Sequence, residues 1–128
     1  MNLTDTLEPL VTLDAARLAE DGDTVIFTYT DAFGRERSGL VYRRGDTLKA
    51  WHNMCPHWAT TLEDEDGQLW DESGCYIQCA QHGALFDPDD GACIFGPPEG
   101  ARLEPLVARP SDDGAEVLVL RAALTLSF

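Results

Sequence analysis

The sequence predicts an all-β fold, an antiparallel sandwich or barrel built from short strands. Two observations favour this class: runs rich in β-branched and aromatic residues recur along the chain, and turn residues separate them. A third is that the only helical signal is one short turn at residues 14–20, which Asp14 could cap. Short strands at regular spacing are typical of sandwiches and barrels.

The predicted strands follow from the residue pattern, in order along the chain. They cover residues 24–30, 37–43, 47–52, 103–108 and 116–121. Turn signals separate neighbouring strands at residues 31–34, 44–46 and 111–114. Within 47–52, alternation places Leu48 and Ala50 on one face. Between residues 52 and 103 the strand pattern weakens while Gly, Pro, Cys and His accumulate, which indicates a functional site on loops.

Length and charge limit the domain organisation and the kinds of partner. The 128 residues contain no repeat, low-complexity tract or linker, so we expect a single domain over residues 1–128. The formal net charge is -14, and the richest basic cluster is Arg35, Arg37, Arg43 and Arg44. A protein that binds nucleic acid or an anionic membrane needs a basic stripe, so neither partner is expected.

The apolar runs and the cysteines indicate the compartment. The longest apolar runs are a few residues, whereas a membrane-spanning helix needs about 20. The first residues lack the basic and apolar segments of a signal peptide. We therefore expect a cytoplasmic protein, and in a reducing compartment its four cysteines favour metal or cofactor ligation over disulfides.

Two ligand pairs stand in the loop region, Cys55-Pro56-His57 and Cys79-Ala80-Gln81-His82. A Cys and a His two or three positions apart on a tight loop can both face one metal centre. Zinc would take all four ligands in one tetrahedron, whereas a 2Fe-2S cluster would place two thiolates on one iron and two imidazoles on the other. The residues of the two pairs alone leave both metals open.

The residues that follow the second pair carry a resemblance. They read His82-Gly83-Ala84-Leu85-Phe86-Asp87, then Asp90-Gly91-Ala92-Cys93 and Gly96-Pro97-Pro98-Glu99-Gly100. Together with the two ligand pairs, this order resembles the Rieske 2Fe-2S family, and in particular its soluble ferredoxin-like members. The resemblance covers roughly residues 10–121. It implies a Rieske-like antiparallel sandwich or barrel, with a loop-built cluster-binding subdomain at about residues 53–100 and one 2Fe-2S cluster.

The resemblance also implies the role of each ligand. Cys55 and Cys79 would bind the buried iron, and His57 and His82 the outer iron. Neutral imidazoles in place of two thiolates make an electron easier to accept. Gly83 and Gly96 would let the backbone approach the cluster and donate hydrogen bonds to its sulfides.

Two departures bear on the subfamily. The respiratory branch has one further cysteine in each ligand loop, joined as a disulfide, where this chain has Thr60 and Gln81. It also places Ser and Tyr hydroxyls against the cluster, where this chain has Ala84 and Phe86. Without those hydrogen bonds, we expect a reduction potential near the low end of the Rieske range, about -150 mV. In addition, 21 residues separate His57 from Cys79, a few more than is usual in small ferredoxins.

The other candidate residues are expected to be structural. Cys75 and Cys93 read as unligated apolar thiols, and Trp51 and Trp70 as packing groups, while Trp58 would shield the cluster. His52 reads as a strand-end residue. Once His57 and His82 are used, the chain cannot build the two-histidine, one-carboxylate iron site of an oxygenase.

These observations predict an electron carrier rather than an enzyme. The expected role is the ferredoxin component of a ring-hydroxylating oxygenase system, with a reductase and a terminal oxygenase as redox partners. The alternatives are the Rieske small subunit of an assimilatory nitrite reductase, a zinc-stabilised interaction module and a redox or iron sensor. Residues 51–100 hold ten acids and no Lys or Arg, so we expect the partners to dock through a basic face.

Overall fold

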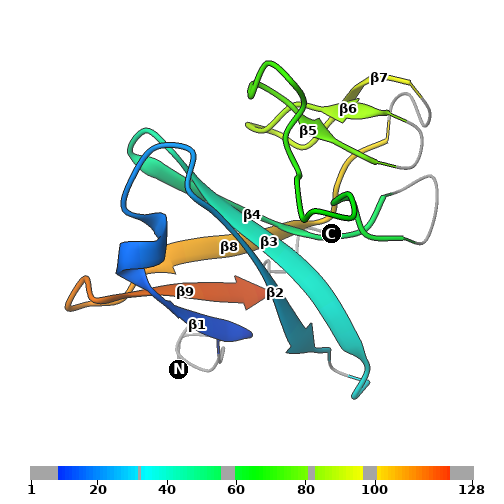
Figure 1. The fold of residues 1–128 in the computed structure, drawn as a ribbon. Coiled ribbons are helices and arrows are strands. Elements are labelled where there is room, and N and C mark those ends of the chain that lie inside the picture. Colours follow the sequence, from blue (N-terminus) through cyan, green and yellow to red (C-terminus); the bar gives the residue numbers. More distant parts are fainter. Residues whose placement is uncertain (1–8, 32, 56–59, 81–82, 97–100, 122–128) are drawn as a thin grey trace, which may run out of the picture. The chain divides into compact units, whose positions relative to one another are not determined.

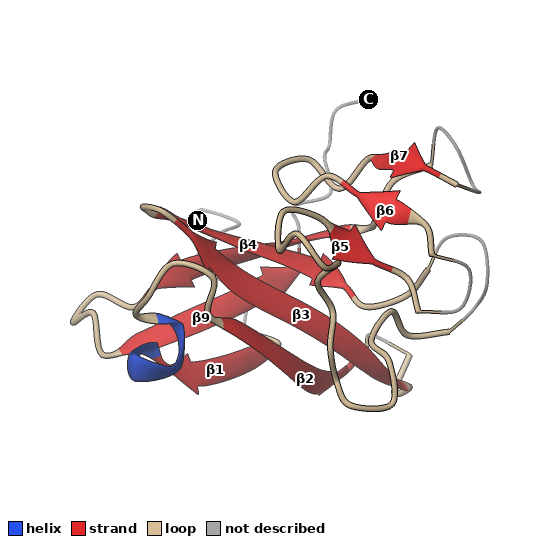
Figure 2. Ribbon diagram, turned by 45° about the horizontal axis from the view of Figure 1, so that its top comes forward, coloured by secondary structure: helices blue, strands red, loops and turns tan. Residues whose placement is uncertain are grey.

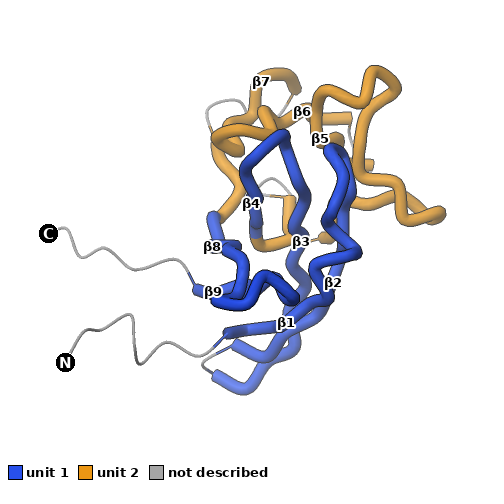
Figure 3. Tube along the Cα trace, turned by 90° about the vertical axis from the view of Figure 1, so that its left-hand side faces the viewer, with its two compact units in different colours: residues 1–51, 105–128 blue, residues 52–104 orange. Residues whose placement is uncertain are grey.

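The computed structural model describes residues 9–31, 33–55, 60–80, 83–96 and 101–121. The predicted all-β class is confirmed. The chain divides into two compact units, one formed by residues 1–51 with 105–128 and the other by residues 52–104 (Figure 3).

The first unit is built on a nearly closed antiparallel sheet of six strands (Figure 1). The strand order is β1-β9-β8-β4-β3-β2. The bounds are β1 Val11–Asp14, β2 Thr24–Thr30, β3 Glu36–Arg44, β4 Thr47–His52, β8 Pro105–Pro110 and β9 Glu116–Arg121. A 3-10 helix, η2 (Ala15–Leu18), follows β1, and the Asp14 carboxylate caps it by accepting from the Ala16 N–H at 2.9 Å. The predicted single turn and its cap are therefore confirmed.

Three of the five predicted strands have the predicted bounds, namely β2, β4 and β9, and β3 is one residue longer at each end. The strand predicted at 103–108 instead runs Pro105–Pro110. Its start moves because residues 101–103 pair within the other unit: the Cys93 N–H donates to the Ala101 carbonyl, and the Leu103 N–H to the Gly91 carbonyl, both at 2.9 Å. The four-residue β1, which pairs with the distant β9, was not predicted.

The core of the first unit comes from the alternating inward residues of the sheet. Ala50 belongs to this core and Leu48 packs against it, as the predicted common face requires. Phe27 is another core residue, and its ring covers Gly39, its partner in the β2–β3 ladder. The core residues are Leu13, Leu18, Val25, Phe27, Tyr29, Val41, Ala50, Leu106, Val117 and Val119.

The second unit has little regular structure. Its three-stranded sheet, in the order β5-β6-β7, consists of Ile77–Gln78, Leu85–Phe86 and Cys93–Phe95. Figure 2 shows these short strands joined by loops and turns. None of them was predicted individually, because two or three residues are too few for a periodic signal. In the described part of the chain, no helix has the length and apolar character needed to cross a membrane.

Candidate functional site

Cys55 lies in the segment that follows β4, which we call the first ligand loop (residues 53–62). Its side chain is buried, with 2 % exposed. The Cys55 N–H donates to the Thr60 carbonyl at 2.9 Å. The predicted ligand His57 and the neighbouring Trp58 lie outside the described residues.

Cys79 follows β5 in the second ligand loop (residues 78–84). It is fully buried, with 0 % exposed. Its N–H donates to the Ala84 carbonyl at 2.9 Å, and its own carbonyl accepts from the Gly83 N–H at 2.8 Å, so two backbone bonds join Cys79 to residues 83 and 84. The fourth predicted ligand, His82, lies outside the described residues.

Hydrogen bonds tie the two ligand loops to each other. The Ala80 N–H, next to Cys79, donates to the Leu62 carbonyl at 3.0 Å. The Leu62 N–H in turn donates to the side-chain oxygen of Asn53 at 3.0 Å. The segments that carry Cys55 and Cys79 are therefore held side by side. Sequence reasoning missed Asn53, although a buried Asn beside a ligand pair is a residue type that often bonds to loop backbone.

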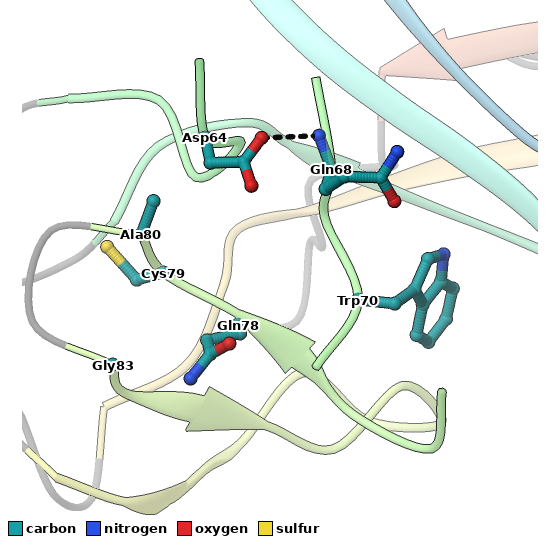
Figure 4. A pocket seen from close by; sticks show the side chains of 7 residues that line it. All are labelled: Asp64, Gln68, Trp70, Gln78, Cys79, Ala80 and Gly83. Carbon is teal, nitrogen blue, oxygen red and sulfur yellow. Dashed lines mark hydrogen bonds between the residues drawn. The ribbon is translucent and has the colours of Figure 1, made fainter. Parts of the chain in front are cut away.

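A cavity of about 250 Å³ lies against the second ligand loop (Figure 4). Its wall includes residues of the acidic insert (residues 63–72), the extra length between the two ligand pairs, and residues of the ligand loop itself. The lining residues are Asp64, Gln68, Trp70, Gln78, Cys79, Ala80 and Gly83. The insert folds back here because the Gln78 N–H donates to the Leu69 carbonyl at 2.8 Å. The acidic insert thus lies beside a predicted ligand.

Two glycines give the backbone its path around the second ligand loop. Gly83 and Gly96 have φ values of +73° and +78°, in the left-handed region. A Cβ added at Gly96 would lie 3.3 Å from the Ala84 Cα, which is tighter than ordinary contact. The buried Cys93 thiol donates to the Gly96 carbonyl at 3.3 Å and to that of Phe95 at 3.5 Å. A side chain at position 96 would therefore require Ala84, in the second ligand loop, to move.

The acidic residues give the second unit a strongly negative surface. Among the described residues, seven of them are exposed: Asp64, Glu65, Asp66, Glu72, Asp89, Asp90 and Glu104. Residues 52–104 contain a single Lys or Arg, Arg102. At the tip of the insert, the Ser73 hydroxyl donates to Asp71 at 2.7 Å, and this bond together with backbone N–H donors lowers the pKa of that carboxyl. The charge is therefore present at neutral pH.

Most of the other residues expected to be structural lie in buried positions where they pack or form hydrogen bonds. His52 is the buried last residue of β4, and its N–H donates to the Glu104 carbonyl at 2.8 Å. The buried Trp51 indole donates to the Tyr42 hydroxyl at 2.7 Å, so both expectations are met. Cys93 is buried as expected, but Cys75 is exposed and the prediction of an apolar thiol there was wrong. Cys75 lies in the turn of residues 71–76, just after the insert, where its N–H donates to the Ser73 hydroxyl oxygen at 3.1 Å.

The described residues fit an iron-sulfur cluster. All four cysteines are described and none forms a disulfide, and the two predicted ligands among them are buried on adjacent loops. No group of three or more possible metal ligands is found among the described residues, which do not include the two predicted histidine ligands. The Gly83 N–H donates to the carbonyl of the second cysteine, and both residues line the cavity. When bound, a 2Fe-2S cluster at such a site accepts and releases one electron.

Comparison with solved structures gives the same fold. The ferredoxin of carbazole 1,9a-dioxygenase from Nocardioides aromaticivorans IC177 is 25% identical, with a TM-score of 0.62, over 88% of this chain and 96% of that one. A putative NADH-dependent nitrite reductase small subunit from Mycobacterium tuberculosis is 22% identical, with a TM-score of 0.59, over 89% and 97%. The terminal oxygenase of carbazole 1,9a-dioxygenase from Novosphingobium sp. KA1 is 19% identical, with a TM-score of 0.59, over 88% of this chain but 30% of that one.

No match was found among curated protein sequences. The family model described as "Rieske [2Fe-2S] domain" matches residues 13–110, most of the chain, including both ligand pairs. This match selects the iron-sulfur cluster from the two metals that the ligand residues alone allowed. The chain therefore belongs to the Rieske [2Fe-2S] domain family and is an electron-transfer protein with one 2Fe-2S cluster, not itself a catalyst.

Proposed function

We propose that this chain is the ferredoxin component of a ring-hydroxylating oxygenase system, and that it carries one electron from a reductase to a terminal oxygenase. The observation that carries the proposal is the share of each relative's length that this chain matches. The chain spans 96% of the carbazole dioxygenase ferredoxin but 30% of the terminal oxygenase. The chain thus matches the ferredoxin over nearly all of its length and the oxygenase over less than a third, which supports the carrier role, and the family domain at residues 13–110 is proposed to act as one domain within residues 1–128.

We assign the cluster ligands as the sequence motif predicts. Cys55 and Cys79 bind the inner iron, and their burial supports this role because a thiolate pair shielded from water stabilises the cluster. His57 and His82 bind the outer iron. Their imidazoles carry no negative charge, which favours reduction of the cluster and gives the electron a short route to a partner.

The docking surface is proposed to lie on the second unit and to combine charge with apolar contact. Ile94 and Phe95 on β7 are 48% and 65% exposed. Phe95 pairs with Leu85, which in turn pairs with Gln78, the neighbour of Cys79. Exposed acids follow β6 at Asp89 and Asp90. A redox partner with a basic rim around an apolar patch fits this surface.

A second candidate is the small subunit of an assimilatory nitrite reductase. It is favoured by the fold shared with the putative small subunit from Mycobacterium tuberculosis, which the match covers over 97% of its length. Both roles place the protein in the cytoplasm, and the four free cysteines agree with that compartment.

Electron delivery to defined acceptors separates the two roles. Reduced holoprotein is mixed with a ring-hydroxylating terminal oxygenase or with the catalytic subunit of a nitrite reductase. Acceptors encoded by genes near that of this protein are preferred. Reoxidation of the cluster is followed by stopped-flow absorbance. We expect fast reoxidation by the oxygenase. Fast reoxidation by the nitrite reductase alone would transfer the assignment to the second candidate.

The docking surface predicts a dependence on salt. Raising ionic strength from about 0.01 to 0.1 M shortens the screening length from about 30 to 10 Å, so electron transfer to a basic partner should slow. At low salt, Asp89→Asn and Asp90→Asn should each slow electron transfer relative to wild type, whereas the matched change Asp112→Asn in the first unit should not. Rates that respond equally to all three substitutions would contradict docking on the second unit.

A further inference from the structure

Asn53 is one of two buried polar side chains in the described part of the chain, and 1 % of it is exposed. Both ends of its amide are used. Its oxygen accepts from the Leu62 N–H at 3.0 Å, and its nitrogen donates to a carboxylate oxygen of Glu63 at 2.7 Å. Burying a polar group is costly unless it is hydrogen-bonded, so this amide holds its position only while both partners remain in place.

The two partners determine which way the amide faces. A carboxylate can only accept and a backbone N–H can only donate, so one orientation of the Asn53 amide satisfies both. Glu63 therefore holds the amide oxygen toward Leu62. The carboxylate of Glu63 is half-buried, unlike those of its neighbours Asp64 and Glu65 in the acidic insert, which are exposed.

The position of this amide connects it to both predicted thiolate ligands. Asn53 precedes Cys55 by two residues, and its amide crosses to Leu62 at the far end of the first ligand loop. The Leu62 carbonyl then accepts from the Ala80 N–H, adjacent to Cys79. A displacement of Leu62 would therefore be transmitted to both ligand loops.

We propose that Asn53 is a positioning residue for the cluster, oriented by Glu63, which holds the two ligand loops in the arrangement that binds iron. The proposal rests on the ligand assignment made under the proposed function. It predicts that the exchange of amide and carboxylate between positions 53 and 63 preserves function. In the double variant, Asn53→Asp with Glu63→Gln, the carboxylate at position 53 would still accept from the Leu62 N–H. The amide at position 63 would donate to that carboxylate, and the net charge would be unchanged.

The test compares four holoproteins: wild type, Asn53→Asp, the double variant, and Glu63→Ala. Cluster release into excess EDTA is followed by visible absorbance, and the reduced cluster by the line widths of its EPR signal. Asn53→Asp places two carboxylates together and should release the cluster about tenfold faster, the effect of losing one buried hydrogen bond to a charged group, with broadened lines. The double variant should return both readouts to near the wild-type values.

Glu63→Ala keeps Asn53 but removes the partner that orients it. We therefore expect a cluster release rate and EPR line widths between those of wild type and those expected for Asn53→Asp, and this variant remains a test even if Asn53→Asp fails to fold. Glu65→Gln is the control for loss of charge, and Val119→Ala, in the core of the first unit, is the control for loss of stability. Neither should broaden the EPR lines.

Two outcomes would contradict these proposals: one would overturn the positioning role of Asn53, and the other would overturn the ligand assignment. Asn53→Asp and Glu63→Ala holoproteins with wild-type line widths and release rates, or with rates that only follow thermal stability as in Val119→Ala, would overturn the positioning role. A wild-type protein without a Rieske EPR signal would instead overturn the ligand assignment.

Discussion

At the scale of single residues, the four cysteines differ in their surroundings, and these differences support the roles proposed for them. Cys55 and Cys79 are buried on two adjacent loops, whereas Cys75 is exposed in the turn of residues 71–76. Cys93 is buried but donates its thiol hydrogen to backbone carbonyls. Because a thiolate is the form that binds iron, we assign a structural role to Cys93, whose sulfur contacts two backbone carbonyls.

This assignment predicts the effect of serine at each cysteine. Cys55→Ser, and His82→Ala at the outer iron, should lose or alter the cluster and lower thermal stability, because ligation energy is also folding energy. Cys75→Ser should leave the visible spectrum unchanged and serves as the matched control. The measurement is visible absorbance together with the iron content of the purified protein. An unchanged spectrum in either of the first two variants would count against the ligand set.

Position 39 requires glycine because the ring of Phe27, its partner in the β2–β3 ladder, lies over it. A Cβ at this position would lie 2.4 Å from the Phe27 Cζ, well inside contact distance. Gly39→Ala should therefore destabilise the fold by about 1–3 kcal/mol, the usual cost of overpacking. In a Phe27→Leu background the same change should cost less, because the smaller side chain leaves room for the methyl group. Chemical denaturation of the four proteins measures this coupling, and equal costs in both backgrounds would refute the contact.

Element bounds were predictable where a strand carries its own signal. β2 alternates buried residues with more exposed ones over its seven positions, and β9 does so over its first four. β5 and β6, with two residues each, are strands because of their partners and not because of any pattern. The start of β8 shifted because backbone pairing in the other unit occupies residues 101–103, a long-range effect that local propensity does not contain.

The turn between β2 and β3 depends on one carboxylate. Asp31 accepts from the Phe33 and Arg35 N–H groups at 2.9 Å and from the Arg35 guanidinium at 3.0 Å. The backbone bond from Arg35 is the largest cause that lowers the pKa of this carboxyl. A carboxyl whose pKa is lowered by folding stabilises the fold above its unfolded pKa of about 3.9, and this contribution is lost as the pH falls below it.

Asp31→Asn should therefore lower the melting temperature at pH 7, and the difference from wild type should narrow below about pH 4. Asp112→Asn removes the same charge from another exposed turn of the first unit and is the control. Thermal unfolding of the three proteins between pH 3 and 7 tests this expectation. A constant difference across that range would mean that the carboxylate charge is not involved.

At the scale of the whole molecule, the sequence predicted the chemistry of the site better than it predicted how the loops of the site pack and bond to each other. The ligand pairs and the motif after them were sufficient to predict the family, which the family match confirms. The location of the acidic insert against the second ligand loop, and the bonds that join the two loops, depend on side-chain and backbone geometry without periodicity. No local pattern contains that information.

The reduction potential is a property of the whole molecule, and two residues near the second ligand pair, Ala84 and Phe86, bear on its value. Ala84 and Phe86 are both fully buried, and neither has a hydroxyl to donate toward a cluster. Redox titration of the holoprotein should give about -150 mV, the low end of the Rieske range. Ala84→Ser and Phe86→Tyr should each raise it, because an added donor stabilises the more negative reduced state. A wild-type potential near about +300 mV would contradict this account.

The order of strands in the sheet has a consequence for synthesis on the ribosome. β1, at one edge, has as its neighbour β9, close to the opposite end of the described chain. All of residues 52–104 are made before β8 and β9 exist, so the unit that carries the ligands can form its local turns while the sheet is still open. The sheet therefore closes last, and the nascent chain exposes an unpaired β1 until β9 emerges.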